Sequence, residues 1–225
     1  MVDICPTVTA ADARTYRVQL EQVVKFARRL HIDVADGQFT PNKLLELDYV
    51  WWPGGLIADI HVMYLKPQSQ LEALIGLHPQ LVIVHAEAEG NFMNFAETLH
   101  HHGIEAGVAL LPETPVESIL PAINVIDHVL IFSGQIGYFG GHANLDLLSK
   151  VKQLKEIKPS LEIGWDGGVD DKNALELTKA GVEVLNAGGF IHGATNPEEA
   201  YNRLRTVVNG GVDKVDDPAA EPRRA

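Results

Sequence analysis

Eight short apolar runs, rich in β-branched residues, recur along the chain at intervals of roughly 25 residues. They span residues 2–5, 30–34, 56–62, 81–85, 105–110, 128–132, 161–165 and 182–186. This spacing is too long for hairpins and fits strands joined by helical crossovers, so it predicts a parallel sheet with helices outside it. Eight such units in 225 residues predict an α/β fold of a single domain, a closed (β/α)8 TIM barrel.

The segments between the runs carry apolar residues at helical spacing. We expect helices over residues 15–29, 145–157 and 170–179, and a last helix that begins at Asn196 with Pro197 in its first turn. An open doubly wound sheet is the rival fold, but it requires a glycine fingerprint after the first strand, where this chain has Cys5, Thr7 and Thr9. Residues 210–225 lack periodicity, so we expect a catalytic barrel domain over 1–209 and a flexible tail over 210–225.

Charge and composition narrow the classes of partner. The formal net charge of -12 argues against binding to nucleic acid or to an anionic membrane, so an anionic substrate must be held by local donors. Cys5 is the single cysteine, which excludes an intrachain disulfide and is compatible with a reducing compartment. No run of about 20 apolar residues is present. We therefore expect a cytoplasmic protein.

Polar residues gather where three of the predicted strands end. His31 and Asp33 alternate along one strand and share a face, His61 belongs to the next strand, and Asp166 closes the seventh. Each histidine taken singly is more typical of a core residue bonded to backbone. The carboxyl ends of barrel strands meet at one rim, however, so the four side chains are expected to converge on a divalent metal ion.

A set of ordered motifs carries a family resemblance. The motifs are HIDVADGQFTPN (31–42), DIHVM (59–63), VHAE (84–87), GVAL (107–110), FGG (139–141), DGG (166–168) and AGG (187–189). With these motifs in this order, from about residue 5 to residue 193, the chain resembles the ribulose-phosphate 3-epimerase family. The resemblance implies a metal-dependent 3-epimerase of a phosphorylated ketose, which would convert D-ribulose 5-phosphate to D-xylulose 5-phosphate.

The resemblance also assigns roles to the convergent residues. It implies that His31, Asp33, His61 and Asp166 hold one divalent ion, and their nitrogen and oxygen atoms suit Zn²⁺, Fe²⁺, Mn²⁺ or Co²⁺ without choosing among them. It further implies that Asp33 and Asp166 form the catalytic acid/base pair. Inversion of a carbon next to a ketone needs a base on one face and an acid on the other, with positive charge near the developing enediolate.

Glycine loops after the last three strands are candidates for phosphate binding, because backbone N–H groups there can approach an anion closely. Together with two side chains that the resemblance places at the substrate, the expected substrate contacts are Thr7, His61, Gly137, Phe139, Gly140, Gly141, Gly167, Gly168, Gly188 and Gly189. Barrel enzymes often bind phosphate with these loops. His85 ends the fourth strand at the same rim, where a structural role, a role in support of the metal ligands and substrate contact all stay open.

Departures from the family pattern leave the substrate open. Ala35 stands where the family has methionine, Gly189 replaces a serine, and the loop around Tyr138 is one residue longer. These changes keep two alternatives in view, an epimerase of another ketose phosphate such as a 6-phosphorylated hexulose, and a phosphate-ligand-binding barrel without turnover. A small phosphorylated ketose is the expected partner. A homo-oligomer is possible, since the adjacent Trp51 and Trp52 fit core packing, a lid or a subunit contact.

Overall fold

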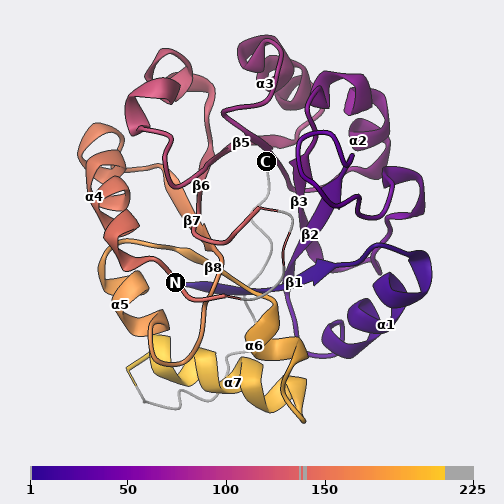
Figure 1. The fold of residues 1–225 in the computed structure, drawn as a ribbon, viewed down its shortest axis with the longest axis vertical. Helices are drawn as coiled ribbons and strands as arrows, with labels where there is room; N and C mark the ends of the chain where they lie inside the picture. Colours follow the sequence, from indigo (N-terminus) through magenta and orange to yellow (C-terminus); the bar gives the residue numbers. More distant parts are fainter. Residues whose placement is uncertain (1, 137, 139–140, 211–225) are drawn as a thin grey trace.

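The computed structural model describes residues 2–136, 138 and 141–210. Eight parallel strands close into a barrel in sequence order, and helices surround it (Figure 1). The strands are β1 (Asp3–Thr9), β2 (Arg29–Ala35), β3 (Ile57–Met63), β4 (Leu81–His85), β5 (Glu105–Leu110), β6 (His128–Phe132), β7 (Glu162–Asp166) and β8 (Val184–Ala187). Because β8 pairs with β1, the sheet is closed. The predicted (β/α)8 barrel is confirmed, and the open doubly wound sheet is excluded.

Helices of the connecting segments form the outer layer. The α-helices are α1 (Ala13–Val23), α2 (Leu71–Leu77), α3 (Phe92–His101), α4 (Leu148–Ile157), α5 (Ala174–Lys179), α6 (Gly189–His192) and α7 (Pro197–Val208). Short 3-10 helices are η1 (Leu47–Tyr49), η2 (Pro67–Gln70), η3 (Val116–Val125) and η4 (Leu145–Leu147). As predicted, the last helix begins after Asn196, whose side chain accepts hydrogen bonds from two backbone N–H groups of the first turn. All but the first residue of the predicted tail lies outside the described residues.

The predicted bounds of two helices are wrong. The helix expected over residues 15–29 spans Ala13–Val23. Ala27 lies in the turn that follows it and Leu30 lies on β2, and both side chains are buried in the core. Their burial extends the apolar spacing beyond the helix end. The helix expected from residue 170 begins at Ala174, because the Asp170 side chain accepts hydrogen bonds from Lys172 N and Asn173 N in the preceding turn.

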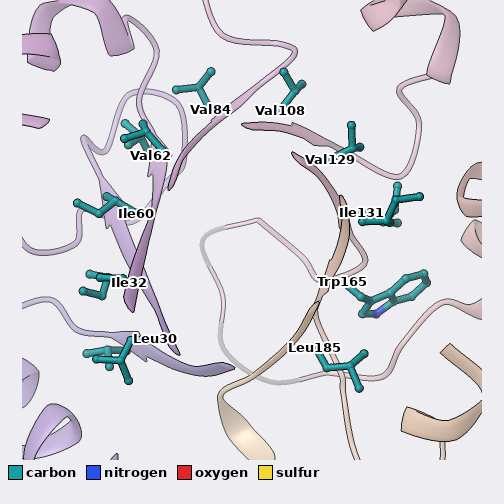
Figure 2. Packing of buried hydrophobic residues seen from close by; sticks show 14 of the residues in the cluster. Leu30, Ile32, Ile60, Val62, Val84, Val108, Val129, Ile131, Trp165 and Leu185 are labelled. Carbon is teal, nitrogen blue, oxygen red and sulfur yellow. The ribbon is translucent and has the colours of Figure 1, made fainter. Parts of the chain in front are cut away.

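Alternate side chains along each strand point outward to the helices or inward to the barrel interior. Figure 2 shows Leu30, Ile32, Ile60, Val62, Val84, Val108, Val129, Ile131, Trp165 and Leu185 directed outward from the ring of strands, toward the helices. Trp165 therefore packs away from the interior although it precedes Asp166, and its indole N–H donates to the carbonyl of Gly167 at 3.1 Å. The opposite face of each strand supplies the residues of the interior. His31 and Asp33 flank the outward Ile32 and lie on that face.

An ion network closes the amino-terminal end of the barrel. Arg29 at the start of β2 donates to Asp59 Oδ2 at 2.7 Å and to both carboxylate oxygens of Glu162 at 2.9 Å. His128 Nδ1 lies 2.7 Å from Glu162 Oε2. Although burial raises the pKa of Glu162, the hydrogen bonds with His128 and Arg29 outweigh it and hold this pKa well below its usual range. The charged form of Glu162 therefore stabilises the folded barrel.

We predict a pH-dependent loss of stability for Glu162→Gln. A carboxylate whose folded pKa is depressed adds stability above its unfolded pKa of about 4.3, and this contribution disappears as pH falls toward the folded value. Since the side chain is 34% exposed, we expect a loss of about 2 kcal/mol at neutral pH, less than for a fully buried pair. Denaturant unfolding at several pH values measures it. The exposed Glu156 serves as control; a loss that is the same at pH 3 and pH 7 would contradict this account.

Candidate metal centre

The four predicted ligand residues lie together inside the barrel. His31 and Asp33 come from β2, His61 from β3 and Asp166 from the end of β7. Each offers one ligand atom, and these four atoms all lie within 4.8 Å of one another. Strand register explains part of this proximity, because Asp33 is paired with His61 across β2 and β3. The spatial convergence inferred from the sequence is present in the fold.

Asp33 stands at the centre of the group. Its Oδ1 lies 3.0 Å from His61 Nδ1 and 3.3 Å from His31 Nε2. Its Oδ2 accepts a hydrogen bond of 2.5 Å from the hydroxyl of Thr9. The sequence analysis missed Thr9 as a residue that orients the carboxylate. The signal is its place on β1 two residues beyond Thr7, in register with Asp33.

The imidazole of His31 supplies the test of whether a cation fits. The residue is fully buried, and neither ring nitrogen makes a hydrogen bond within the described part of the chain, although Nε2 lies 3.3 Å from Asp33 Oδ1. Buried polar atoms are nearly always hydrogen-bonded, so an ion bound beside Asp33 would give this ring the partner that it lacks. Two imidazoles and two carboxylates also form a donor set typical of Zn²⁺, Fe²⁺, Mn²⁺ or Co²⁺. The residues therefore fit one divalent ion.

The two aspartates differ in their affinity for protons. Burial raises the pKa of Asp166 to about 6, and the negative charge of Asp33 adds to the rise. Burial acts in the same direction on Asp33, but the adjacent imidazoles of His31 and His61 outweigh it and hold its pKa well below the usual range. Asp33 thus stays ionised at pH values where Asp166 takes up a proton. Paired carboxyl groups whose pKa values are driven apart are suited to opposite roles in acid/base chemistry.

A cavity of about 400 Å³ opens beside the two aspartates. Asp33 and Asp166 both line it, and so do several predicted substrate contacts, namely Thr7, Gly141, Gly167, Gly168, Gly188 and Gly189. His61 is fully buried and is not among the lining residues. The other predicted contacts, Gly137, Phe139 and Gly140, lie outside the described residues. Among the described lining residues there is no lysine or arginine, so local N–H and hydroxyl donors must meet an anion.

Close packing explains why glycines follow β7. Gly167 and Gly168 have φ values of +109° and +71°, which side chains rarely adopt. A Cβ atom on Gly167 would lie 2.3 Å from the backbone nitrogen of Gly134, and one on Gly168 would lie 2.2 Å from that of Ala143. These two glycines therefore bring the loop after β7 against the loop after β6. Both loops contribute to the same side of the cavity.

Asn186 is a second residue that the sequence analysis missed. It lies on β8 in register with Asp166, lines the cavity and is 2% exposed. Neither atom of its amide has a hydrogen-bond partner within the described ranges, and the same holds for the buried hydroxyl of Thr7. Two unpartnered polar groups at the cavity wall are available to a polar ligand. The sequence signal is a lone asparagine in an otherwise apolar strand.

The structure also places His85, whose role the sequence left open. His85 is buried, and its Nε2 lies 2.8 Å from Nε2 of His61. Burial lowers the pKa of His85 to about 4, so the ring is neutral at physiological pH. It is not among the residues that line the main cavity. His85 thus contacts a predicted metal ligand from the side that faces away from Asp33.

Across the described ranges, no helix combines the length and the apolar character needed to cross a bilayer.

Comparisons with known proteins can now be set beside this geometry. A sequence model of the ribulose-phosphate 3 epimerase family matches residues 3–192. The ribulose-phosphate 3-epimerase of Helicobacter pylori strain J99 is 34% identical over 91% of this chain and 97% of its own length. The protein of the same name from Bacillus subtilis is 30% identical, over 91% of this chain and 99% of its own. A solved structure, 3-keto-L-gulonate-6-phosphate decarboxylase from Vibrio cholerae, gives a TM-score of 0.71 at 12% identity and covers 94% of this chain and 99% of its own, a likeness of fold alone.

Proposed function

The chain belongs to the ribulose-phosphate 3-epimerase family, and from this premise we propose that it interconverts D-ribulose 5-phosphate and D-xylulose 5-phosphate. The observation that carries the proposal is the pair Asp33 and Asp166, two carboxyl groups from different strands that line one cavity and bring oxygen atoms within 4.8 Å of each other. Epimerisation at a carbon next to a ketone requires such a pair, because the proton must leave from one face and return to the other.

The two aspartates have opposite roles in proton transfer. One aspartate removes the proton from C3 while the other, in its protonated form, delivers a proton to the opposite face. The roles reverse for the reverse reaction. Thr9, which donates to Asp33 Oδ2, holds the Asp33 carboxylate in one orientation. Because the carboxylate is already oriented, less free energy is needed to align it when the proton is transferred.

His31, Asp33, His61 and Asp166 would hold one divalent ion at this site. When bound, the ion supplies a Lewis acid that stabilises negative charge developing on the substrate oxygens. The ion expected is Zn²⁺, Fe²⁺, Mn²⁺ or Co²⁺, since the donor atoms suit each of them. The buried ring of His31, whose nitrogens make no hydrogen bond within the described residues, supports this assignment.

The glycine loops that line the cavity are the proposed binding site of the phosphate. The loops after β7 and β8 bring Gly167, Gly168, Gly188 and Gly189 to the cavity wall, where backbone N–H groups can approach an anion. Gly141 and Thr7 line the same cavity. A phosphorylated ketose therefore has its anionic end and its reacting carbon in one cavity. The overall acidity of the chain adds no attraction for it.

The proposal is tested by NMR of each purified ketose phosphate with protein loaded separately with each of the four metals, before and after addition of a chelator. We expect conversion between the two pentulose phosphates and its loss on chelation. Solvent deuterium at C3 of the product separates an epimerase from a barrel that only binds the ligand. A metal-loaded protein that neither converts the substrate nor exchanges its C3 proton would refute the proposal. Comparing kcat/KM for pentulose and hexulose phosphates decides which ketose fits.

Asn186→Val is predicted to separate function from stability. Loss of an amide that hydrogen-bonds the substrate should lower kcat/KM about 10-fold, equivalent to roughly 1.4 kcal/mol. Because the amide is buried and has no partner within the described part of the protein, its replacement by an apolar side chain should leave thermal stability unchanged or raise it. Steady-state kinetics and thermal unfolding measure the two effects. Asn196→Ala is the control, since removal of this helix cap should cost about 1 kcal/mol and leave KM unchanged.

If Asn186→Val lowers stability and leaves kcat/KM intact, Asn186 has a structural role and makes no contact with the substrate.

A further inference from the structure

A chain of polar contacts leads away from the metal centre through β4. His61 presents its Nδ1 to Asp33 Oδ1 and its Nε2 to His85 Nε2, at 3.0 Å and 2.8 Å. The other nitrogen of His85, Nδ1, lies 3.4 Å from Glu87 Oε2. Both of these last atoms are buried and have no hydrogen-bond partner elsewhere in the described chain. A closer approach of a few tenths of an ångström would satisfy both of them.

Glu87 is itself held in place by the loop that follows β5. Its Oε1 accepts hydrogen bonds from the hydroxyl of Thr114 and from Leu111 N, the latter at 3.2 Å. Lys150 of α4 fixes this loop, because its ammonium group donates to the carbonyls of Leu111, Pro112 and Thr114 at 2.7–2.8 Å. The carboxylate beside His85 is therefore anchored to two further elements of the fold.

The contacts determine where the protons must lie when a cation is bound. His61 Nδ1 faces the centre of the ligand group, so it must offer its lone pair there and carry its proton on Nε2. That proton then points at Nε2 of His85, which can accept the hydrogen bond only if it carries no proton itself. The proton of His85 is left on Nδ1, which faces the Glu87 carboxylate. Along this sequence, the partner of each imidazole fixes which of its two nitrogens carries the proton.

We propose that His85 and Glu87 are positioning residues for His61. Through this sequence of contacts they select the tautomer of His61 and the orientation of its ring, so that Nδ1 is directed at the divalent ion. The inference rests on the metal site of the proposed function and adds to it two residues that touch neither the ion nor the substrate. Outer partners of this kind typically contribute 10- to 100-fold to metal affinity.

The test measures the dissociation constant for Zn²⁺ by competition with a chelator. His85→Leu removes the acceptor, Glu87→Gln removes the charge, and His85→Gln retains an acceptor at the end of its side chain. We expect Zn²⁺ to bind roughly 10- to 100-fold more weakly to the first two variants and the third to recover much of the affinity. Nitrogen-15 NMR of the Zn²⁺-loaded wild type should show protons on Nε2 of His61 and Nδ1 of His85.

Two matched variants control for general effects. His128→Leu removes another buried barrel imidazole that faces a glutamate, at the opposite end of the barrel, and Glu89→Gln neutralises a glutamate that is 60% exposed. Both should bind Zn²⁺ as wild type does. If His85→Leu does not fold, Glu87→Gln and Thr114→Val, at partly exposed positions, decide the question.

Unchanged Zn²⁺ affinity in folded Glu87→Gln and His85→Leu, or a proton on Nδ1 of His61 in the loaded protein, would overturn the positioning role while the metal site stands. A wild-type protein that binds no divalent ion would instead refute the metal site of the proposed function. Equal weakening by His128→Leu would show that the loss of affinity comes from general destabilisation of the barrel and would also overturn the inference.

Discussion

Asp166→Asn is expected to lower the rate of epimerisation by roughly 10³- to 10⁴-fold while the barrel remains folded. An asparagine amide keeps the size of the side chain and an oxygen atom, but it can neither take up nor deliver the proton. The substitution removes a carboxyl group whose pKa is raised to about 6 by burial and by the negative charge of Asp33. Conversion of the pentulose phosphates, followed by NMR at saturating metal, measures the effect.

The same variant also tests the assignment of the two faces. With Asp166 neutralised, Asp33 can still remove the C3 proton of the epimer whose C–H bond it faces. Deuterium from solvent should therefore enter one epimer and not the other, without inversion. Asp33→Asn should show the opposite preference. Exchange of both epimers by a single variant would contradict the arrangement on two faces.

A matched control lies on the same strand. Glu162 begins β7 and Asp166 ends it, so Glu162→Gln changes a carboxylate of β7 at the far end of the barrel. It is expected to lower stability, as described above, and to leave inversion and deuterium exchange intact. A loss of activity in Glu162→Gln comparable with that in Asp166→Asn would show that the rate depends on the integrity of β7 rather than on the carboxyl group.

The fold could be predicted from the sequence because its signals are local. The apolar runs at 81–85, 105–110 and 128–132 coincide with β4, β5 and β6, and the recurrence of such runs sets the number of strands. Alternation along a strand also places His31 and Asp33 on one face without knowledge of the neighbours. The convergence of four ligand residues then follows from barrel closure. Local pattern and topology thus account for the convergence of the four candidate ligands.

The residues that the sequence analysis missed depend on relations between strands. Thr9 reaches Asp33 because β1 and β2 pair in a particular register, and Asn186 lies beside Asp166 because β7 and β8 do so. No spacing within one segment encodes such a register, which is set by the stagger of the closed sheet. The contact of His85 with His61 has the same origin. Contacts of this kind could be found only in the assembled barrel.

Removal of the divalent ion is expected to abolish measurable epimerisation and to lower thermal stability together. Without a positive charge near the developing enediolate, the barrier should rise by several kcal/mol, a loss of about 10³-fold or more. Removing an ion present at 1,000 times its dissociation constant withdraws roughly 4 kcal/mol of stabilisation, which corresponds to a fall in Tm of about 10 °C for a chain of this size. Dialysis against a chelator, followed by activity and melting measurements, tests both effects.

Restoration by single metals completes this test. Adding Zn²⁺, Fe²⁺, Mn²⁺ or Co²⁺ separately to the depleted protein should return activity and Tm together, and the metal that restores both at the lowest concentration is the best candidate for the native ion. His31→Leu is the matched variant, because it removes a proposed ligand whose ring nitrogens make no hydrogen bond within the described residues. In this variant the ion should no longer raise Tm. Full activity in protein shown to be metal-free would contradict the metal site and leave the two aspartates to act without it.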